Sequence, residues 1–182
     1  LTITNSVIAD NLGESSAGGV SGGSSTITLV NTTVSGNVGN GIQISGGTLN
    51  VQSSMVINNI FGGDGGGIAN GGGTVNVIGS TVSGNRAEQG GGGISTINGT
   101  MNVTGSNVIN NTSIYGGGGG IRTNGRLNVT DSNISNNIDN SPGFGGGGIF
   151  SGAQLVTLNI TRTSITGNST TGPGGGIYNE GA

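Results

Sequence analysis

The sequence is built from one segment of eleven residues that occurs seven times. Each copy opens with alternating apolar residues, as in LTITNSVIADN at the start of the chain and VNVIGSTVSGN near its middle. Successive copies begin 26, 22, 26, 26, 26 and 31 residues apart, at Leu1, Ile27, Leu49, Val75, Met101, Leu127 and Leu158. A repeat of this length indicates a solenoid, in which each repeat buries its apolar residues against its neighbours.

Four positions of the segment hold the same kind of residue in every copy. The third and eighth are aliphatic, the sixth is Ser or Thr, and the eleventh is Asn, at Asn11, Asn37, Asn59, Asn85, Asn111, Asn137 and Asn168. A further aliphatic residue follows one or more glycines ahead of each next segment, at Val20, Ile42, Ile68, Ile94, Ile121, Ile149 and Ile177. These columns are typical of a structural repeat rather than of a ligand site.

Short runs of Val, Ile and Thr that alternate with polar residues predict strands with one buried face. No stretch has the spacing of an amphipathic helix. The sequence therefore predicts an all-β fold, a parallel β-helix of about seven coils of about 26 residues, with three short strands per coil and equivalent positions about 4.8 Å apart. The preferred handedness of parallel crossovers predicts a right-handed coil.

The many asparagines and glycines fit the corners of such coils. Of the 182 residues, 44 are Gly, and glycine readily adopts the positive φ that a tight corner needs. We expect the Asn of each corner to take a left-handed conformation and to exchange amide hydrogen bonds with the Asn of the next coil. The Ser/Thr column is expected to form an inward ladder of hydroxyl groups.

The glycine and asparagine motifs also carry a family resemblance. GGGI at residues 65–68, 91–94 and 174–177, combined with segments such as VSGN at residues 34–37, resembles the repeats of bacterial polymorphic outer-membrane and autotransporter-type passenger proteins. More widely, the chain resembles the pectate-lyase-like superfamily of right-handed β-helices over its whole length. The resemblance implies an extracellular or cell-surface adhesive rod of a bacterium or archaeon, although Val or Ile stands where the polymorphic family has Phe.

Composition excludes several classes of function. The net charge is −3 and only four residues are basic, all of them Arg, so a nucleic-acid partner is not expected. No apolar run is long enough for a membrane span. Without His or Cys, nucleophilic triads and most transition-metal sites are also excluded, and we expect no cofactor.

A polysaccharide lyase or hydrolase is the alternative to a non-enzymatic rod. Such chemistry needs clustered carboxylates with a basic group nearby. The plausible pair is Asp64 and Glu88 on adjacent coils, with Arg86 near them, on an edge that Glu14 and Asp139 are expected to share. The other interpretation of this edge is a solvated loop surface that keeps the rod soluble.

The chain is expected to form a single array over residues 1–182, a whole number of repeats without capping elements. An open end coil exposes apolar residues and strand edges. We therefore expect the end coils to stack, either head to tail on a second copy or on flanking repeats of a longer chain. The residues of this predicted interface are Leu1, Ile3, Ile8, Asn11, Leu158, Ile160, Ile165, Asn168 and Ile177.

An outward column of Thr and Asn runs beside the first strand of each repeat. It contains Thr2, Thr28, Asn50, Asn76, Asn102, Asn128 and Asn159. Ordinary stacking between strands, binding of a glycan or host surface, and binding of ice are the alternatives for this column. Asn102, Asn128 and Asn159 also lie in Asn-x-Ser/Thr sequences and are the candidate glycosylation sites.

Overall fold

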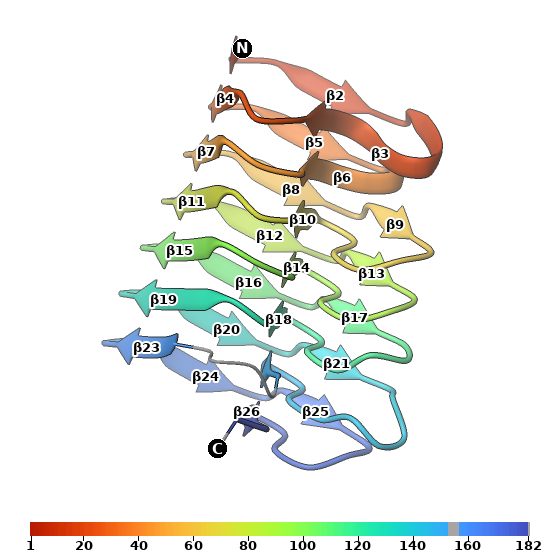
Figure 1. Ribbon diagram of the computed structural model, residues 1–182, viewed down its shortest axis with the longest axis vertical. Coiled ribbons are helices and arrows are strands. Elements are labelled where there is room, and N and C mark those ends of the chain that lie inside the picture. Colours follow the sequence, from red (N-terminus) through yellow and green to blue (C-terminus); the bar gives the residue numbers. More distant parts are fainter. Residues whose placement is uncertain (153–156, 182) are drawn as a thin grey trace.

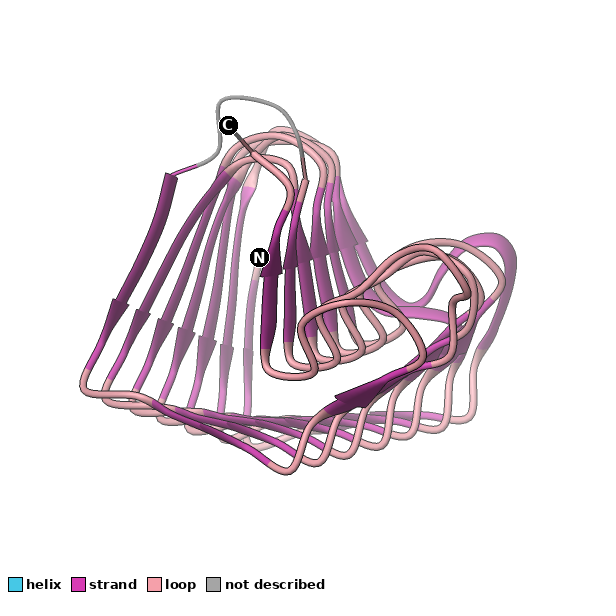
Figure 2. Cartoon of the chain, turned by 90° about the horizontal axis from the view of Figure 1, so that it is seen from below, coloured by secondary structure: helices cyan, strands magenta, loops and turns pink. Residues whose placement is uncertain are grey.

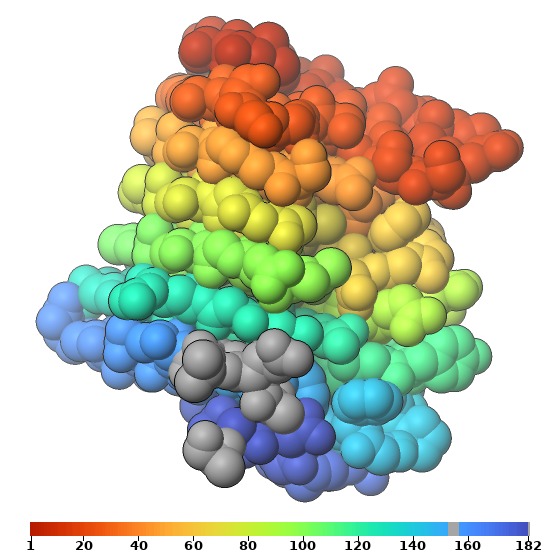
Figure 3. Space-filling view, viewed as in Figure 1, coloured from red at the N-terminus to blue at the C-terminus, as the bar shows by residue number. Residues whose placement is uncertain are grey.

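The computed structural model describes residues 1–152 and 157–181. Within these residues the chain forms 26 strands and no helix, and it winds as a right-handed solenoid of about seven coils (Figures 1 and 2). Space-filling atoms show the coils as successive bands from the N-terminus to the C-terminus (Figure 3). The predicted all-β parallel solenoid with a spacing of roughly 26 residues is confirmed.

Three parallel sheets run along the rod. The first has seven strands, β1 (Thr2–Thr4), β4 (Thr26–Val30), β7 (Thr48–Gln52), β11 (Thr74–Ile78), β15 (Thr100–Thr104), β19 (Arg126–Thr130) and β23 (Thr157–Thr161). The second also has seven, β2 (Val7–Ala9), β5 (Thr33–Ser35), β8 (Met55–Ile57), β12 (Thr81–Ser83), β16 (Asn107–Ile109), β20 (Asn133–Ser135) and β24 (Ser164–Thr166). Equivalent residues of successive copies pair in register in both sheets.

The third sheet has twelve strands and differs from the prediction of one strand per coil. In each of the first two coils this sheet has a single strand, β3 (Leu12–Gly22) in the first and β6 (Val38–Ile44) in the second. In the other coils it has an outer strand, β9 (Ile60–Phe61), β13 (Arg86–Ala87), β17 (Thr112–Ser113), β21 (Ile138–Asp139) or β25 (Ser169–Thr170). It also has an inner strand there, β10 (Ile68–Asn70), β14 (Ile94–Thr96), β18 (Ile121–Thr123), β22 (Ile149–Ser151) or β26 (Ile177–Asn179). These coils thus have four strands.

The chain between the outer and inner strands leaves the main coil and returns to it, forming a side lobe along the rod (Figure 2). We define the lobe of each coil as the residues between its corner Asn and the aliphatic residue that opens the inner strand. In the third coil these are residues 60–67. The glycine-rich sequence at the end of this segment is therefore the route by which the chain re-enters the coil.

The four aliphatic columns meet inside the rod. In the fourth coil Val75, Val77, Val82 and Ile94 are all fully buried, and they belong to one continuous apolar core. The equivalent residues of the neighbouring coils stack directly above and below them. Because side chains alternate along each short strand, its apolar residues face the core and the residues between them face outward.

The Asn of the eleventh position forms a buried ladder, the Asn ladder, defined by Asn11, Asn37, Asn59, Asn85, Asn111, Asn137 and Asn168. The backbone N–H and the Nδ2 of Asn85 both donate to Oδ1 of Asn111 at 3.0 Å, and Nδ2 also donates to the Val56 carbonyl at 2.9 Å. Oδ1 of Asn85 in turn accepts the backbone N–H and the Nδ2 of Asn59, each at 3.0 Å. The buried amide therefore uses all of its donors and acceptors.

The Ser/Thr column forms the predicted hydroxyl ladder. Ser80 is buried and accepts a hydrogen bond on Oγ from the backbone N–H of Ser54 at 3.0 Å. Its hydroxyl donates to the carbonyls of Ile78 and Val51, while its own N–H donates to Oγ of Ser106 at 3.1 Å. The ladder thus ties the corner between the first two sheets of one coil to the next coil.

The expectation that the corner Asn itself is left-handed is wrong. Positive φ occurs instead at the fifth residue of every copy, Asn5, Asn31, Ser53, Gly79, Gly105, Asp131 and Arg162, and at the tenth, Asp10, Gly36, Asn58, Gly84, Asn110, Asn136 and Gly167. Each of these residues directly precedes a ladder residue. The left-handed residue turns the chain, and the next residue can then point its side chain inward with an ordinary backbone conformation.

The glycines of the GGGI motif have three separate functions. Gly65 has a φ of +72°, a conformation that glycine adopts without steric cost, and a Cβ there would lie 2.5 Å from the carbonyl oxygen of Ile68. A Cβ on Gly66 would lie 2.4 Å from the carbonyl oxygen of Arg86 in the next coil. A Cβ on Gly67 would lie 2.6 Å from the carbonyl oxygen of Gly93 and 2.9 Å from Nδ2 of Asn85. The motif therefore recurs because the lobe re-enters the coil directly against the Asn ladder.

Asn85→Ala is expected to destabilise the protein by about 3 kcal/mol, because the buried N–H of Asn59 loses its acceptor while Nδ2 of Asn59 and Oδ1 of Asn111 each lose one of their two partners. Asn76→Ala in the same coil removes a half-buried amide of the outward column and is expected to cost less than about 1 kcal/mol. Urea denaturation followed by circular dichroism measures both. Equal losses for the two variants would contradict the role assigned to the Asn ladder.

Gly67→Ala is expected to lower the stability by about 1–3 kcal/mol, as overpacking of a tight interior does. Gly23→Ala is the matched control, because a Cβ there has no atom within 4 Å and the φ of Gly23 is not positive. Thermal denaturation of the two variants should show a clear decrease of Tm for Gly67→Ala alone.

Candidate functional site

The second coil is shorter than its neighbours, and the difference lies in its lobe. Only residues 38–41 separate Asn37 from Ile42, whereas residues 60–67 separate Asn59 from Ile68 in the third coil. Four lobe residues are thus missing from the second coil. Asn40 occupies part of the vacated space, because its Nδ2 donates to the Asp64 carbonyl at 2.8 Å and to the Gly65 carbonyl at 2.5 Å.

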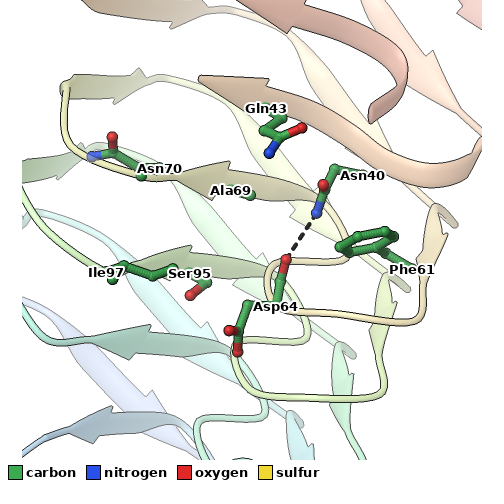
Figure 4. A pocket seen from close by; sticks show the side chains of 9 residues that line it. Asn40, Gln43, Phe61, Asp64, Ala69, Asn70, Ser95 and Ile97 are labelled. Carbon is green, nitrogen blue, oxygen red and sulfur yellow. Dashed lines mark hydrogen bonds between the residues drawn. The ribbon is translucent and has the colours of Figure 1, made fainter. Parts of the chain in front are cut away.

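A pocket with a volume of about 170 Å³ lies at this change of coil length. Phe61 and Asp64 belong to the lobe of the third coil, while Ala69 and Ser95 lie on the outer face of β10 and β14. Figure 4 shows these side chains around Ala69. The full lining consists of Asn40, Gln43, Phe61, Asp64, Ala69, Asn70, Gly71, Ser95 and Ile97.

Two buried polar atoms of the pocket lining have no hydrogen-bond partner among the described residues. They are Oδ1 of Asn40 and Oγ of Ser95, whose residues are 0% and 2% exposed. The orientation of the Asn40 amide is fixed, because its Nδ2 faces two carbonyl oxygens, which only a donor can satisfy. Asn40 therefore presents an acceptor that needs a donor from outside the protein.

Asp64 is held in place by contacts to two later coils. Its Oδ1 accepts the backbone N–H of Gly90 at 2.8 Å and NH1 of Arg122 at 2.8 Å. Of the predicted group Asp64, Glu88 and Arg86, the basic residue is not the one that pairs with Asp64. The cation that pairs with Asp64 is Arg122, two coils along, and Glu88 is exposed on the lobe surface.

The outer face of the inner strands carries a column that does not repeat. Residues paired in register along it are Ser21, Gln43, Ala69, Ser95, Arg122, Phe150 and Tyr178. The Arg122 guanidinium lies 5.9 Å from the centroid of the Phe150 ring, which in turn contacts Tyr178 and Phe144. The chemistry of this face therefore changes from polar and small to cationic and aromatic along the rod.

Asp139 is not on a solvated edge as expected. It is fully buried, and its carboxylate accepts hydrogen bonds from the backbone N–H and the hydroxyl of Ser141 and from the hydroxyl of Thr170. Glu14 is exposed on β3. Among residues 1–152 and 157–181, no three Asp, Glu, His or Cys side chains lie close enough to hold a metal ion.

The predicted interface residues lie on the two end coils. At the N-terminal end Leu1 is 69% exposed, Asn11 is exposed, and Ile3 and Ile8 are partly buried against the core. At the other end Ile177 is 38% exposed, and the residues that are partly buried are Leu158, Ile160, Ile165 and Asn168. These positions continue columns whose members are fully buried in the middle of the rod.

The outward Asn residues form a second amide ladder on the surface. Nδ2 of Asn102 donates to Oδ1 of Asn76, Nδ2 of Asn128 to Oδ1 of Asn102, and Nδ2 of Asn159 to Oδ1 of Asn128, each at 2.8 Å. The candidate glycosylation sites Asn102, Asn128 and Asn159 are thus stacked, and the nitrogen that a glycan would modify is the one that donates within the stack.

The pocket was not found from the sequence. Two signals in the sequence mark its place. They are the spacing of 22 residues after Ile27 and the outer column of the inner strands, where the residue type changes from coil to coil. A site built from residues that occur once leaves no repeated column in the sequence.

Comparison of the chain with protein-family models, curated proteins and solved structures gave no match. Among the described residues, no helix has the length and apolar character needed to cross a membrane.

The exposed pair of Asp131 and Arg162, joined by a bidentate contact at 2.6 and 2.8 Å, gives a test by pH. The hydrogen bond from Arg162 lowers the pKa of Asp131 below its ordinary value. The pair therefore stabilises the fold above the unfolded pKa of about 3.9, and this contribution is lost as the pH falls through the lower folded value. Both groups are exposed, so screening keeps the effect small.

Arg162→Gln is expected to return the pKa of Asp131 toward its ordinary value, as followed by a carboxyl NMR titration. Arg126→Gln is the control. Arg126 is the first residue of β19, the strand that ends directly before Asp131, and the ion pair of Asp131 is with Arg162. The titration of Asp131 should therefore be unchanged in this variant. An unchanged pKa in Arg162→Gln would show that the ion pair does not form in solution.

Proposed function

We propose that this protein is a non-enzymatic structural or adhesive rod at the cell surface or outside the cell, extended by end-to-end stacking of its coils. The observation that carries the proposal is the complementarity of the two end faces. Each hydrogen-bond ladder ends in donors on one face and in acceptors on the other.

The Asn ladder has one direction throughout. The backbone N–H and Nδ2 of Asn11 donate to Oδ1 of Asn37, and every later member donates in the same sense as far as Asn168. Among the described residues, Oδ1 of Asn11 therefore accepts nothing, and the N–H of Asn168 has no acceptor. A coil placed against Asn168 with its own Asn11 in register would satisfy both groups.

The strand edges and the apolar core also make the two end faces complementary. At one end β1 and β2 each pair on one side only, as do β23 and β24 at the other. Leu1 and Ile177 leave apolar surface open on these faces. Parallel strands of identical register can continue across such a joint, which is heterologous and does not close on itself. Flanking repeats of a longer chain would fit the same two faces.

Cleavage of a polysaccharide is less well supported. Of the two carboxylates expected to act as acid and base, Asp64 is bound by Arg122 and Glu88 is exposed on the lobe of the next coil. Two carboxyl groups must flank a scissile bond in most glycoside hydrolases. A rod that binds partners through its sides, such as a glycan or a host surface, remains compatible with the adhesive part of the proposal.

Electron microscopy of the purified chain tests the proposal directly. Stacked subunits should give filaments with an axial repeat of about 34 Å, seven coils of about 4.8 Å each. Monomers alone would contradict stacking between copies and favour the flanking repeats of a longer chain as the partner of the end faces.

Ile3→Asp or Ile160→Asp is expected to abolish filaments, because each places a charge in the core column beside the joint. Glu88→Gln, on an exposed lobe, serves as the control and should assemble normally. Circular dichroism must show a folded chain for each variant. Filaments that persist in both end variants would rule out the proposed joint.

A further inference from the structure

The pocket beside the shortened second coil differs in chemistry from the rest of the rod. Among the described residues five buried side-chain atoms lack a hydrogen-bond partner, and two of them, Oδ1 of Asn40 and Oγ of Ser95, belong to the lining of this one pocket. Buried polar atoms without a partner are rare in folded proteins. Their occurrence together beside a cavity points to a ligand that supplies the missing hydrogen bonds.

The lining selects for the kind of ligand. Asn40 can only accept, Ser95 can donate and accept, and Gln43 can do both through an amide that makes no hydrogen bond among the described residues. Phe61 adds an apolar ring on the lobe side. A molecule with several hydroxyl groups around its edge and a C–H face would match both the polar and the apolar walls.

Charge argues against an ionic ligand. The one carboxylate of the lining, Asp64, already pairs with Arg122 at 2.8 Å, so the pair as a whole is neutral. A cation would meet Arg122 nearby, and an anion would meet Asp64. The remaining polar side chains of the lining, Asn40, Gln43, Asn70 and Ser95, carry no charge.

Size sets a further limit. The cavity of about 170 Å³ is close to one of about 150 Å³ that holds a benzene ring, and it is too small for a larger ligand. One six-membered ring fits. We propose that this pocket binds a single neutral sugar ring, either free or as one residue of a glycan, with hydroxyl groups bonded to Asn40 and Ser95 and the C–H face against Phe61.

Both unpaired atoms are closed to solvent in the unliganded conformation. Access therefore requires one lining side chain to turn aside. Gln43, which Figure 4 shows near Asn40, is only partly buried and gives up no hydrogen bond to a described residue when it moves, so it is the lining side chain best able to turn aside.

The test is NMR titration of the ¹⁵N-labelled chain with methyl glucoside, methyl galactoside and N-acetylglucosamine, together with galacturonic acid as the charged comparison. At least one neutral sugar should give saturable shifts at the amides of Ala69 and Ser95. Galacturonic acid should bind more weakly. No saturable shift with any neutral sugar, or tighter binding of the acid, would overturn the proposal.

Variants locate the site. Ala69→Leu fills the pocket and should weaken binding by more than about tenfold, while Ser21→Leu, in the same column but exposed two coils away, should not change it. Ser95→Ala removes a hydroxyl that has no partner in the free protein, so it should keep the fold and weaken binding about fivefold or more. Shifts that survive Ala69→Leu would place binding elsewhere. The pocket lies away from both end faces, so this result is independent of filament formation.

Discussion

The buried Asn ladder is the interaction on which the rest of the coil depends. Each amide between the two end coils has its full set of partners, as at Asn85, and two of them are the amides directly above and below. A side chain that must bond along the rod axis in both directions fixes the spacing and the register of the coils together. It also leaves no room beside it, so that the returning lobe passes the ladder as bare backbone at Gly67. The glycine motif is thus a consequence of the ladder, and the left-handed residue ahead of each ladder position turns the amide inward.

A ladder in which every member donates in the same direction has no natural end. Whatever the number of coils, one face has an unused carbonyl oxygen and the other has unused N–H groups, as at Asn11 and Asn168. The surface ladder of Asn50 to Asn159 runs in the opposite sense, with each Nδ2 donating toward the N-terminus. The two faces are therefore distinguishable, and only a head-to-tail arrangement satisfies both ladders at once. Specificity of stacking follows from hydrogen-bond direction, whereas apolar burial at the joint supplies attraction without direction.

The fold could be predicted from the sequence because its determinants repeat. Columns such as Val77, Ser80 and Val82 occur seven times over, and short alternating runs can bury one face only if the coils stack. The error about which corner residue is left-handed had a local cause. Asn is prominent at the eleventh position, but the tenth holds only Asn, Asp or Gly, as at Asp10 and Gly36, and that restriction is the clearer sign of positive φ. The extra strand of the third sheet was missed because outer strands such as β13 (Arg86–Ala87) contain only two residues, too few for a period to be recognised.

The candidate site was unpredictable for the opposite reason, since it depends on residues that occur once. Asp64 and Arg122 lie in the third and fifth coils, and only the folded rod brings the acid and the base together. The pocket arises where four lobe residues are absent, so that Asn40 has to satisfy the carbonyl groups of the next lobe with its Nδ2 and is left with a free oxygen. Single buried groups lack partners in coils of regular length as well, as at Thr96, but at the shortened coil the unpaired atoms lie beside a cavity. Departures from the repeat are therefore where binding sites should be sought in such rods.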